Sequence, residues 1–391
     1  MISVDKALHI IKSFPKEYTF ETVELRNALN LVLFEDIFSP INMPPFRQSA
    51  MDGYAFRYSE NQKFTIVEES KAGDGHNYVL NEGEAVRIFT GALVPDNADT
   101  VIMQEHVERE GEIIQIKKMP FQFANIRKVG EQINIGELAL KKGTQLNEAA
   151  IGFLAGLGIT TISVYKTPKV AILVTGNELQ KPGTKLELGR IYESNSIMLE
   201  AALKSIGVKD IELIRVKDNY NSIKNRIKKT LSTKDILLIS GGISVGDYDF
   251  VREALLENEV EELFYKVNQK PGKPLWFGKK ANTYVFALPG NPASALTCFY
   301  IYARPLLKKI SGCKNNYLQK VKVISKTVIN NSSGKTLFLK AHLEGNSVEV
   351  LQGQSSAMLY TYALSNALIC VDSETTEIKI GDEVECIKLV L

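Results

Sequence analysis

Cysteine is scarce in this sequence, and its few copies are not spaced as ligands. The four cysteines, Cys298, Cys313, Cys370 and Cys386, lie far apart and form no C-x-x-C pair. This spacing argues against a zinc knuckle and against a disulfide framework. A reducing compartment fits best, so we expect the protein in the cytoplasm.

Histidine is equally scarce, and two common catalytic patterns are missing. The four histidines are scattered and suggest no Ser/His/Asp arrangement. The sequence also has no Walker-type G-x-x-x-x-G-K-S/T motif. The chemistry must therefore be sought in other residue types.

An excess of one charge and a long apolar run are also absent. The 47 basic and 45 acidic residues leave a net charge of +2, which lacks the electrostatic footprint of a dedicated nucleic-acid binder. The longest charge-free stretch, residues 149–165, contains three glycines and is shorter than the ~20 apolar residues that span a bilayer. Asp5 and Lys6 interrupt the N-terminal pattern, which argues against a secretory signal. We expect no nucleic-acid partner and no membrane span.

The apolar material that is present suffices for several ordinary cores. The chain has 391 residues, 45% of them hydrophobic, and at roughly 150 residues per domain this length predicts two to four domains. Helical patterns, strand-sized apolar runs and prolines divide the chain further. The predicted regions are a helical N-terminal arm and linker (1–40 plus 136–167), a β-rich insert (41–135), an α/β domain (168–312) and a C-terminal β domain (313–391).

Hydrophobic periodicity predicts the elements of these regions. The arm is expected to hold helices at 4–11, 24–33 and 147–157 and a strand at 159–165. Between 169 and 310 strands alternate with helices, which is typical of βαβ units and predicts a parallel sheet. The expected strands are 169–174, 211–216, 235–239, 263–267 and 283–287, and the expected helices are 196–206, 221–231, 250–257 and 292–309. The C-terminal region is expected to hold a hairpin of 337–343 and 348–351, then strands at 367–371 and 384–389.

Four unusual loops follow predicted strands of the α/β region. Ligands of open parallel sheets bind outside the carboxyl ends of the strands, where these loops converge. The loop 240–249 carries three glycines and two serines before a helix, which suits an anion, and its acids suit a hard cation. Each loop alone is equally typical of a tight strand-to-helix turn. Together, the loops 175–178, 217–219, 240–249 and 288–292 predict a site for phosphate and magnesium.

A lysine cluster adds positive charge near these loops. Lys266, Lys270 and Lys273 lie in the segment 265–274, where two prolines and a glycine stiffen the backbone. Lysine binds oxyanions as a point charge, so phosphate or another oxoanion is a natural partner. The alternative is a generic charged surface loop.

Three motifs of the β-rich insert lie outside the α/β region. They are residues 42–55, 90–95 and 127–132, and they contain Asp52, Thr90 and Arg127. Read alone, each is compatible with a simple turn. They contribute to the α/β site only if domains or subunits meet.

Six motifs together resemble one known family. They are residues 49–55 (SAMDGYA), 90–92 (TGA), 175–178 (TGNE), 240–246 (SGGISVG), 270–274 (KPGKP) and 288–292 (LPGNP). In this order they resemble molybdopterin molybdenumtransferases of the MoeA type, which are related to the C-terminal part of gephyrin, and the match spans nearly the whole chain. The resemblance implies a multidomain α/β plus β fold with a three-layer, molybdopterin-binding α/β domain and a C-terminal domain like a β-barrel.

The resemblance also implies a reaction and an assembly. Molybdate and adenylylated molybdopterin give molybdenum cofactor and AMP with Mg²⁺. The implied assembly is an elongated homodimer in which Asp52 completes the site of the other subunit. Molybdopterin adenylyltransferase and the proteins that mature molybdoenzymes are the partners expected in the pathway.

The site residues carry over by motif position. The acidic site residues are Asp52, Glu178, Asp218 and Asp249, and the last three are the implied Mg²⁺ ligands. The implied substrate contacts are Thr90, Arg127, Thr175, Ser240, Gly241, Gly242, Ser244, Lys266, Lys270, Lys273, Pro289, Gly290, Asn291, Ser294, Lys340, Ser355 and Ser356.

The sequence departs from the family pattern at several positions. Gln132 and Asn177 stand where many members have acids, which keeps an oxygen ligand but removes the charge. Lys335 and Lys340 stand where members often have arginines, so the arginine fork is lost. A divergent oxyanion preference, such as tungstate, is one alternative. The others are a molybdopterin adenylyltransferase, which is usually the α/β module alone, and a gephyrin-like scaffold without catalysis.

Overall fold

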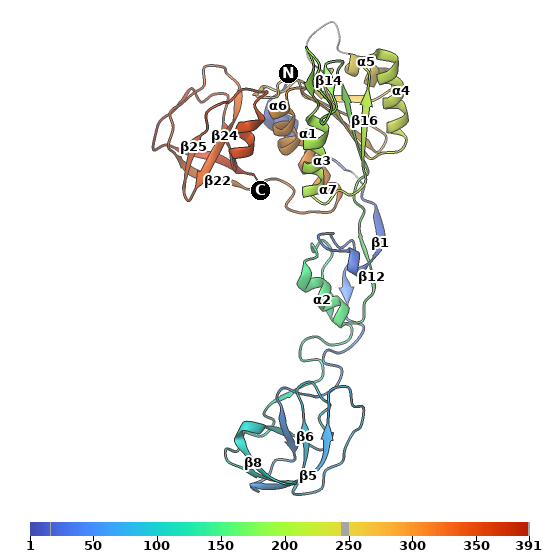
Figure 1. The fold of residues 1–391 in the computed structure, drawn as a ribbon, viewed down its shortest axis with the longest axis vertical. Coiled ribbons are helices and arrows are strands. Elements are labelled where there is room, and N and C mark those ends of the chain that lie inside the picture. The colour runs from blue at the N-terminus through green and yellow to red at the C-terminus, as the bar shows by residue number, and fades with distance from the viewer. Residues whose placement is uncertain (16, 244–249, 390–391) are drawn as a thin grey trace. The chain divides into compact units, whose positions relative to one another are not determined.

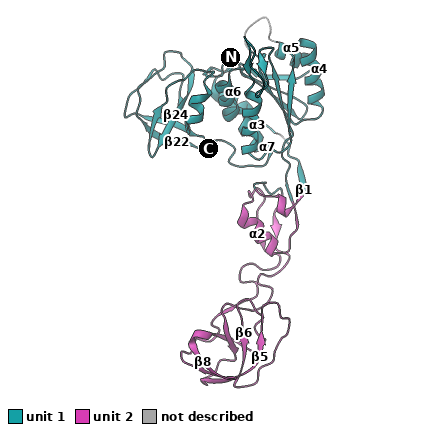
Figure 2. Cartoon of the chain, in the orientation of Figure 1, with its two compact units in different colours: residues 1–22, 30–34, 163–391 teal, residues 23–29, 35–162 magenta. Residues whose placement is uncertain are grey.

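The computed structural model describes residues 1–15, 17–243 and 250–389 (Figure 1). The chain splits into two compact units, with residues 1–22, 30–34 and 163–391 in unit 1 and residues 23–29 and 35–162 in unit 2 (Figure 2). The division falls within β1 (Phe20–Glu24) and β12 (Thr161–Tyr165), which pair with each other. No helix in the described ranges is long and apolar enough to cross a membrane.

Unit 1 contains a six-stranded sheet in the order β16-β13-β17-β21-β20-β18. The strands are β13 (Val170–Thr175), β16 (Ile211–Val216), β17 (Ile236–Ser240), β18 (Glu261–Tyr265), β20 (Trp276–Lys280) and β21 (Thr283–Leu288). The five strands expected from the sequence are confirmed, and β20 was missed. The sheet is mixed, because β18 and β20 run antiparallel to their neighbours. The short segment 266–275 joins these two strands, and a parallel crossover needs about a dozen residues or more.

Helices bury both faces of this sheet. Along β13, Val170 and Ile172 belong to one core while Ala171 and Leu173 belong to the other, as the period of two requires. The first core is shared with α1 (Val4–Lys12), α3 (Asn195–Ser205), α6 (Pro292–Cys298), the π-helix Phe299–Ala303 and α7 (Arg304–Ile310). The second is shared with α4 (Tyr220–Leu231) and α5 (Phe250–Glu257).

The N-terminal segment differs from the predicted helical arm. Helix α1 begins after Ser3, whose hydroxyl accepts from the Lys6 N–H, and its apolar face packs in the first core of unit 1. The helix predicted at 24–33 is wrong. That stretch holds the end of β1 and only a 3₁₀ turn, Leu25–Asn27, followed by Asn30 with a left-handed φ of 67° that ends helical backbone.

A closed β-barrel forms the C-terminal part of unit 1. Its strands follow the order β19-β24-β25-β22-β28-β26, and β26 pairs back to β24. They are β19 (Gln269–Lys270), β22 (Lys320–Ser325), β24 (Thr336–Glu344), β25 (Ser347–Val350), β26 (Ala367–Val371) and β28 (Glu383–Lys388). The predicted hairpin is confirmed as β24 and β25. Smaller elements are β14 (Leu179–Gln180), β15 (Ile191–Tyr192), β23 (Ile329–Asn330), β27 (Glu377–Ile378) and α8 (Leu359–Leu364).

Unit 2 contains a separate six-stranded sheet in the order β7-β4-β6-β5-β9-β8. The strands are β4 (Gly53–Phe56), β5 (Lys63–Ser70), β6 (Glu84–Ile88), β7 (Thr100–Met103), β8 (Val107–Glu110) and β9 (Ile113–Ile116), with the 3₁₀ turn Gln104–His106 after β7. Two short ladders join β3 (Gln48–Ser49) to β10 (Ile126–Arg127) and β2 (Ile37–Phe38) to β11 (Leu138–Leu140). The predicted helix at 147–157 is confirmed as α2 (Glu148–Gly156), capped by Asn147.

Candidate active site

A cavity of about 490 Å³ lies at the carboxyl ends of β13, β17 and β21 in unit 1. The unusual loops predicted from the sequence lie at this same edge of the sheet. Its lining includes the predicted residues Thr175, Glu178, Ser240, Gly241, Pro289, Gly290 and Asn291. Parallel neighbours β13, β17 and β21 end side by side, which brings residues more than a hundred positions apart to one wall.

Glycines allow two of these loops to approach each other closely. A Cβ on Gly241 would lie 2.5 Å from the Thr175 carbonyl oxygen, and one on Gly242 would lie 2.7 Å from a Val251 methyl group. Both glycines have positive φ, at 98° and 64°. The turn after Ser240 therefore exposes backbone rather than side chains beside the cavity.

The predicted acids of unit 1 lie on neighbouring loops. Asp218 accepts a hydrogen bond of 3.1 Å from the Thr175 hydroxyl, and its backbone N–H donates to Asn177 Oδ1 at 3.4 Å. Glu178 lines the cavity itself. Asp249 and Ser244 lie outside the described residues. Within the described ranges, no three His, Cys, Asp or Glu side chains group closely enough to hold a metal ion on their own.

A second cavity, of about 750 Å³, adjoins the first and separates the α/β part from the barrel. Pro274, Pro289 and Asn291 line both cavities. The second cavity gathers positive and hydroxyl-bearing side chains from four segments of the chain. They are Lys270, Lys273, Lys335, Ser294, Ser355 and Ser356.

Two other predicted lysines do not line either cavity. The Lys266 ammonium lies 4.6 Å from the centre of the Tyr265 ring. Lys340 is 3% exposed, and its Nζ donates to the carbonyls of Gly353, Met358 and Ser355 at 2.8, 3.0 and 3.2 Å. Three carbonyls use all three N–H groups of an ammonium, so Lys340 has no donor left for a ligand. Burial lowers the pKa of this lysine.

Sequence reasoning missed two polar residues of the first cavity. Asn195 Nδ2 donates to Ser240 Oγ at 2.8 Å and to the Gly290 carbonyl at 2.7 Å, which ties two cavity loops together. Glu193 is 2% exposed and accepts from the Ser196 N–H at 2.7 Å and from Arg215 at 3.3 Å. The available signal was a run of polar residues, 193–196, at the start of a predicted helix.

The predicted residues of unit 2 form a local cluster of their own. Asp52 accepts from the Thr90 N–H at 2.7 Å and from the Thr90 hydroxyl at 2.8 Å. These donors, the backbone N–H first, lower the pKa of Asp52. Arg127 pairs with Gln48 in the β3–β10 ladder, a few residues before Asp52. The 42–55 motif therefore meets the other two motifs of the insert within one unit.

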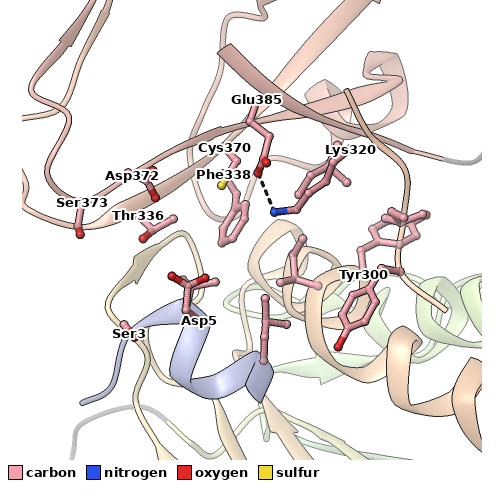
Figure 3. Close-up of a pocket in the computed structure, with 16 residues that line it drawn as sticks. Ser3, Asp5, Tyr300, Lys320, Thr336, Phe338, Cys370, Asp372, Ser373 and Glu385 are labelled. Atoms are coloured by element: carbon pink, nitrogen blue, oxygen red, sulfur yellow. Dashed lines mark ion pairs between the residues drawn. The ribbon is translucent and has the colours of Figure 1, made fainter. Parts of the chain in front are cut away.

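A smaller cavity, of about 140 Å³, lies between α1 and the barrel and contains none of the predicted site residues. Its polar lining includes Asp5, Asp372 and the ion pair of Lys320 with Glu385 at 2.7 Å (Figure 3). Leu8 and Phe338 supply apolar surface.

Family models match the chain in three consecutive parts. They are the MoeA N-terminal region (domains I and II) at residues 2–158, a probable molybdopterin binding domain at residues 171–309, and the MoeA C-terminal region (domain IV) at residues 322–389. Both cavities lie in the parts matched by the second and third models.

Full-length relatives agree with these matches. The chain is 34% identical over 395 residues to a molybdopterin molybdenumtransferase of Haemophilus influenzae, covering 98% of each chain. It is 30% identical to molybdopterin molybdenumtransferase 2 of Mycobacterium tuberculosis, covering 98% of this chain and 99% of that protein. A crystal structure of the molybdopterin biosynthesis MoeA protein from Pyrococcus horikosii superposes with a TM-score of 0.85 at 31% identity, covering 99% of each chain.

The fold and site define a multidomain transferase with mixed α/β content and a closed C-terminal barrel. The chain belongs to the MoeA family of molybdopterin molybdenumtransferases, and its role is in molybdenum cofactor biosynthesis.

Proposed function

We propose that this chain transfers molybdenum from molybdate to adenylylated molybdopterin and releases AMP. The observation that carries the proposal is the pair of adjoining cavities that share Pro289 and Asn291. One is bordered by a glycine turn and the other by lysines and serines. Two anionic reactants are thereby held side by side, which converts an encounter in solution into a reaction within one complex.

The adenylylated pterin occupies the first cavity in this proposal. Its phosphates face the backbone at Ser240, Gly241 and Gly242, because a turn without side chains lets backbone N–H groups approach phosphate oxygens. Thr175 and the 288–292 loop flank this turn on either side, because β13 and β21 both pair with β17. Asn195 ties the adjacent loops of Ser240 and Gly290 together.

Molybdate occupies the second cavity. Lys270, Lys273 and Lys335 supply positive charge, while Ser294, Ser355 and Ser356 supply hydroxyl donors. A tetrahedral dianion needs both to replace its hydration shell. Lys340 has a different role from the one the sequence suggested: it fixes the backbone that carries the two serines instead of contacting the oxyanion.

Magnesium fits this acid set as a shared ion. Mg²⁺ is usually held by one or two carboxylates plus substrate phosphates and waters, so a group of three protein acids is not required. Glu178 and Asp218 would hold it beside the first cavity, and the family motif adds Asp249, which lies outside the described residues. When bound, the ion neutralises charge at the phosphoanhydride.

We further propose a homodimer in which Asp52, Thr90 and Arg127 complete the site of the partner subunit. This assignment rests on the cluster of these residues and on their separation from unit 1 in the chain. A three-layer arrangement of the α/β domain, a cytoplasmic location and contacts with molybdopterin adenylyltransferase and molybdoenzyme maturation proteins belong to the same proposal.

The test is AMP release from adenylylated molybdopterin at increasing molybdate, with and without Mg²⁺. We expect the wild type to require both ions. Lys270→Gln should raise the molybdate concentration for half-maximal release and leave the pterin affinity within a few-fold. AMP release that ignores molybdate would contradict the proposal. A parallel tungstate series reports whether Asn177 and Gln132 accompany an altered oxyanion preference.

A further inference from the structure

A buried amide lies directly beneath the lysine loop of the second cavity. Gln269 in β19 is 1% exposed while its neighbour Lys270 is exposed, because successive side chains of a strand point to opposite faces. Gln269 Nε2 donates to the carbonyls of Pro271 at 3.0 Å and Gly272 at 3.3 Å. One side chain thus ties the backbone between Lys270 and Lys273 from the inside.

The carbonyl oxygen of this amide also has a buried hydrogen-bond partner. The buried Tyr302 hydroxyl donates to Gln269 Oε1. Gln269 Nε2 also lies 3.5 Å from Cys298 Sγ, and the Cys298 thiol donates to the Gly272 carbonyl at 3.7 Å. Burial raises the pKa of both Tyr302 and Cys298, so both keep their protons at neutral pH. Both polar atoms of the Gln269 side chain therefore have partners.

The backbone at Gly272 packs so closely against Gln269 and Cys298 that no larger residue fits there. Gly272 has a φ of 87°, which favours glycine, and a Cβ there would lie 2.5 Å from Cys298 Sγ and 2.8 Å from Gln269 Nε2. Backbone pairing adds a second constraint, because Gln269 and Lys270 stand opposite Thr336 and Leu337 in the β19–β24 ladder. The turn is fixed on its buried side and at its start.

We propose that Gln269 is a positioning residue for oxyanion binding. It fixes the backbone from which Lys270 and Lys273 extend, so that two flexible side chains start from a set separation. A neutral amide suits this role, because it donates to two carbonyls without placing a compensating charge near the lysines. Buried hydrogen bonds of this kind rigidify a site only when every member is satisfied. The inference rests on the proposed function of the lysines.

The test compares Gln269→Leu with a matched control in the AMP-release assay. Gln269→Leu introduces an apolar side chain of similar bulk and removes both the amide donors and the Oε1 acceptor. The molybdate concentration for half-maximal release should rise on the order of tenfold, because small displacements of binding groups are costly. The half-saturating pterin concentration should stay within about twofold. A purely structural loss would lower only the amount of active enzyme and leave the molybdate half-saturation unchanged.

The control is Asn258→Leu, which removes a buried amide whose two carbonyl partners belong to helices α4 and α5 and not to the lysine loop. Asn258 Nδ2 donates to the carbonyls of Ala254 at 2.7 Å and Lys224 at 3.1 Å. It lines neither cavity. This variant should lower the thermal midpoint as Gln269→Leu does, with no change in molybdate half-saturation. An equal rise in both variants would overturn the inference.

A Lys270→Gln arm separates failure of the inference from failure of the proposed function. If Lys270→Gln leaves molybdate half-saturation unchanged, the lysine assignment itself is wrong. If Lys270→Gln raises it and Gln269→Leu does not, only the positioning role is overturned. The double variant should show less than the product of the two single effects, because both act on one contact.

Tyr302→Phe covers the case in which Gln269→Leu does not fold. It removes only the hydrogen bond to Gln269 Oε1, and it should raise molybdate half-saturation by a smaller factor in the same direction. An unchanged value in this variant would count against the positioning role.

Discussion

The side-chain amide of Asn291 donates a hydrogen bond of 2.8 Å to the hydroxyl of Ser356. Next to it, the Ser294 N–H donates to the Ser356 carbonyl at 3.1 Å. Asn291 and Ser294 belong to the α/β part, whereas Ser356 follows the barrel strand β25. The wall of the second cavity is thus assembled from two parts of the chain. A substitution there affects both the packing of the barrel against the α/β part and the binding of a ligand.

Experiment should distinguish the proposed roles of Lys335 and Lys340, of which the first binds the oxyanion and the second stabilises the fold. Lys340→Met leaves three carbonyls without their shared donor and should cost about 2 kcal/mol or more of stability. Lys335→Met should leave stability nearly unchanged but raise molybdate half-saturation several-fold. Thermal unfolding and the AMP-release assay check the pair. A stability loss confined to Lys335→Met would reverse the two assignments.

The link between Thr90 and Asp52 predicts a pH effect with a definite sign. Thr90→Val removes the hydroxyl donor but keeps the backbone N–H, so the lowered pKa of Asp52 should rise part of the way to its usual value. A carboxylate with a depressed pKa contributes its stabilisation above its unfolded pKa and loses it as pH falls through the folded pKa. Thr90→Val should therefore lose this contribution at a higher pH than the wild type. NMR titration of the Asp52 carboxyl carbon measures the shift, and a pKa that stays or falls would contradict the assignment.

A shared site predicts complementation between two inactive variants. In an equal mixture of Asp52→Ala and Asp218→Ala subunits, half of the dimers are mixed, and each mixed dimer has one intact site. Activity should return to about a quarter of the wild-type value. If each subunit completed its own site, mixing would restore nothing. A monomer in light scattering at micromolar concentration would also rule out the shared site.

The acid Glu178 should act on turnover more than on binding. Glu178→Gln keeps the shape and one oxygen but removes the charge that favours a magnesium ion. Loss of a group that stabilises developing charge typically lowers the rate on the order of a hundredfold. Substrate affinity should change much less, which rapid-quench measurements of AMP formation distinguish from binding. A variant with wild-type turnover and unchanged Mg²⁺ dependence would exclude this role.

Strand ends could be predicted from the sequence because they depend on local apolar runs and on a general property of parallel sheets. Thr175 and Ser240 end β13 and β17, and their loops meet as expected. The antiparallel strand β20 was missed because its run, 276–280, ends in charged residues and follows a stiff loop. At 24–33 a helix was predicted where none forms. The apolar spacing there is helical, but Asn30 takes a left-handed φ.

The role of a lysine could not be predicted from its type. Lys335 and Lys340 lie close in the chain. Lys335 lines a cavity, whereas the Lys340 ammonium donates all its hydrogen bonds to carbonyls of residues 353–358. That difference depends on where a distant loop folds back. Asn195 was missed for the same reason, since Ser240 and Gly290 are brought near it only by the tertiary structure. Gln269 contacts the nearby carbonyls of Pro271 and Gly272, but its burial against Tyr302 is likewise set by the tertiary structure.

Anomalous diffraction from crystals soaked with tungstate, AMP and Mg²⁺ tests the central claim most directly. Tungstate is a heavy analogue of molybdate, and the strong anomalous scattering of tungsten identifies its position. The account predicts a tungsten peak in the cavity lined by Lys270, Lys273 and Ser356, with the AMP phosphate in the adjoining cavity near Gly241. A tungsten peak in any other place, or AMP bound away from the 240–242 turn, would contradict it.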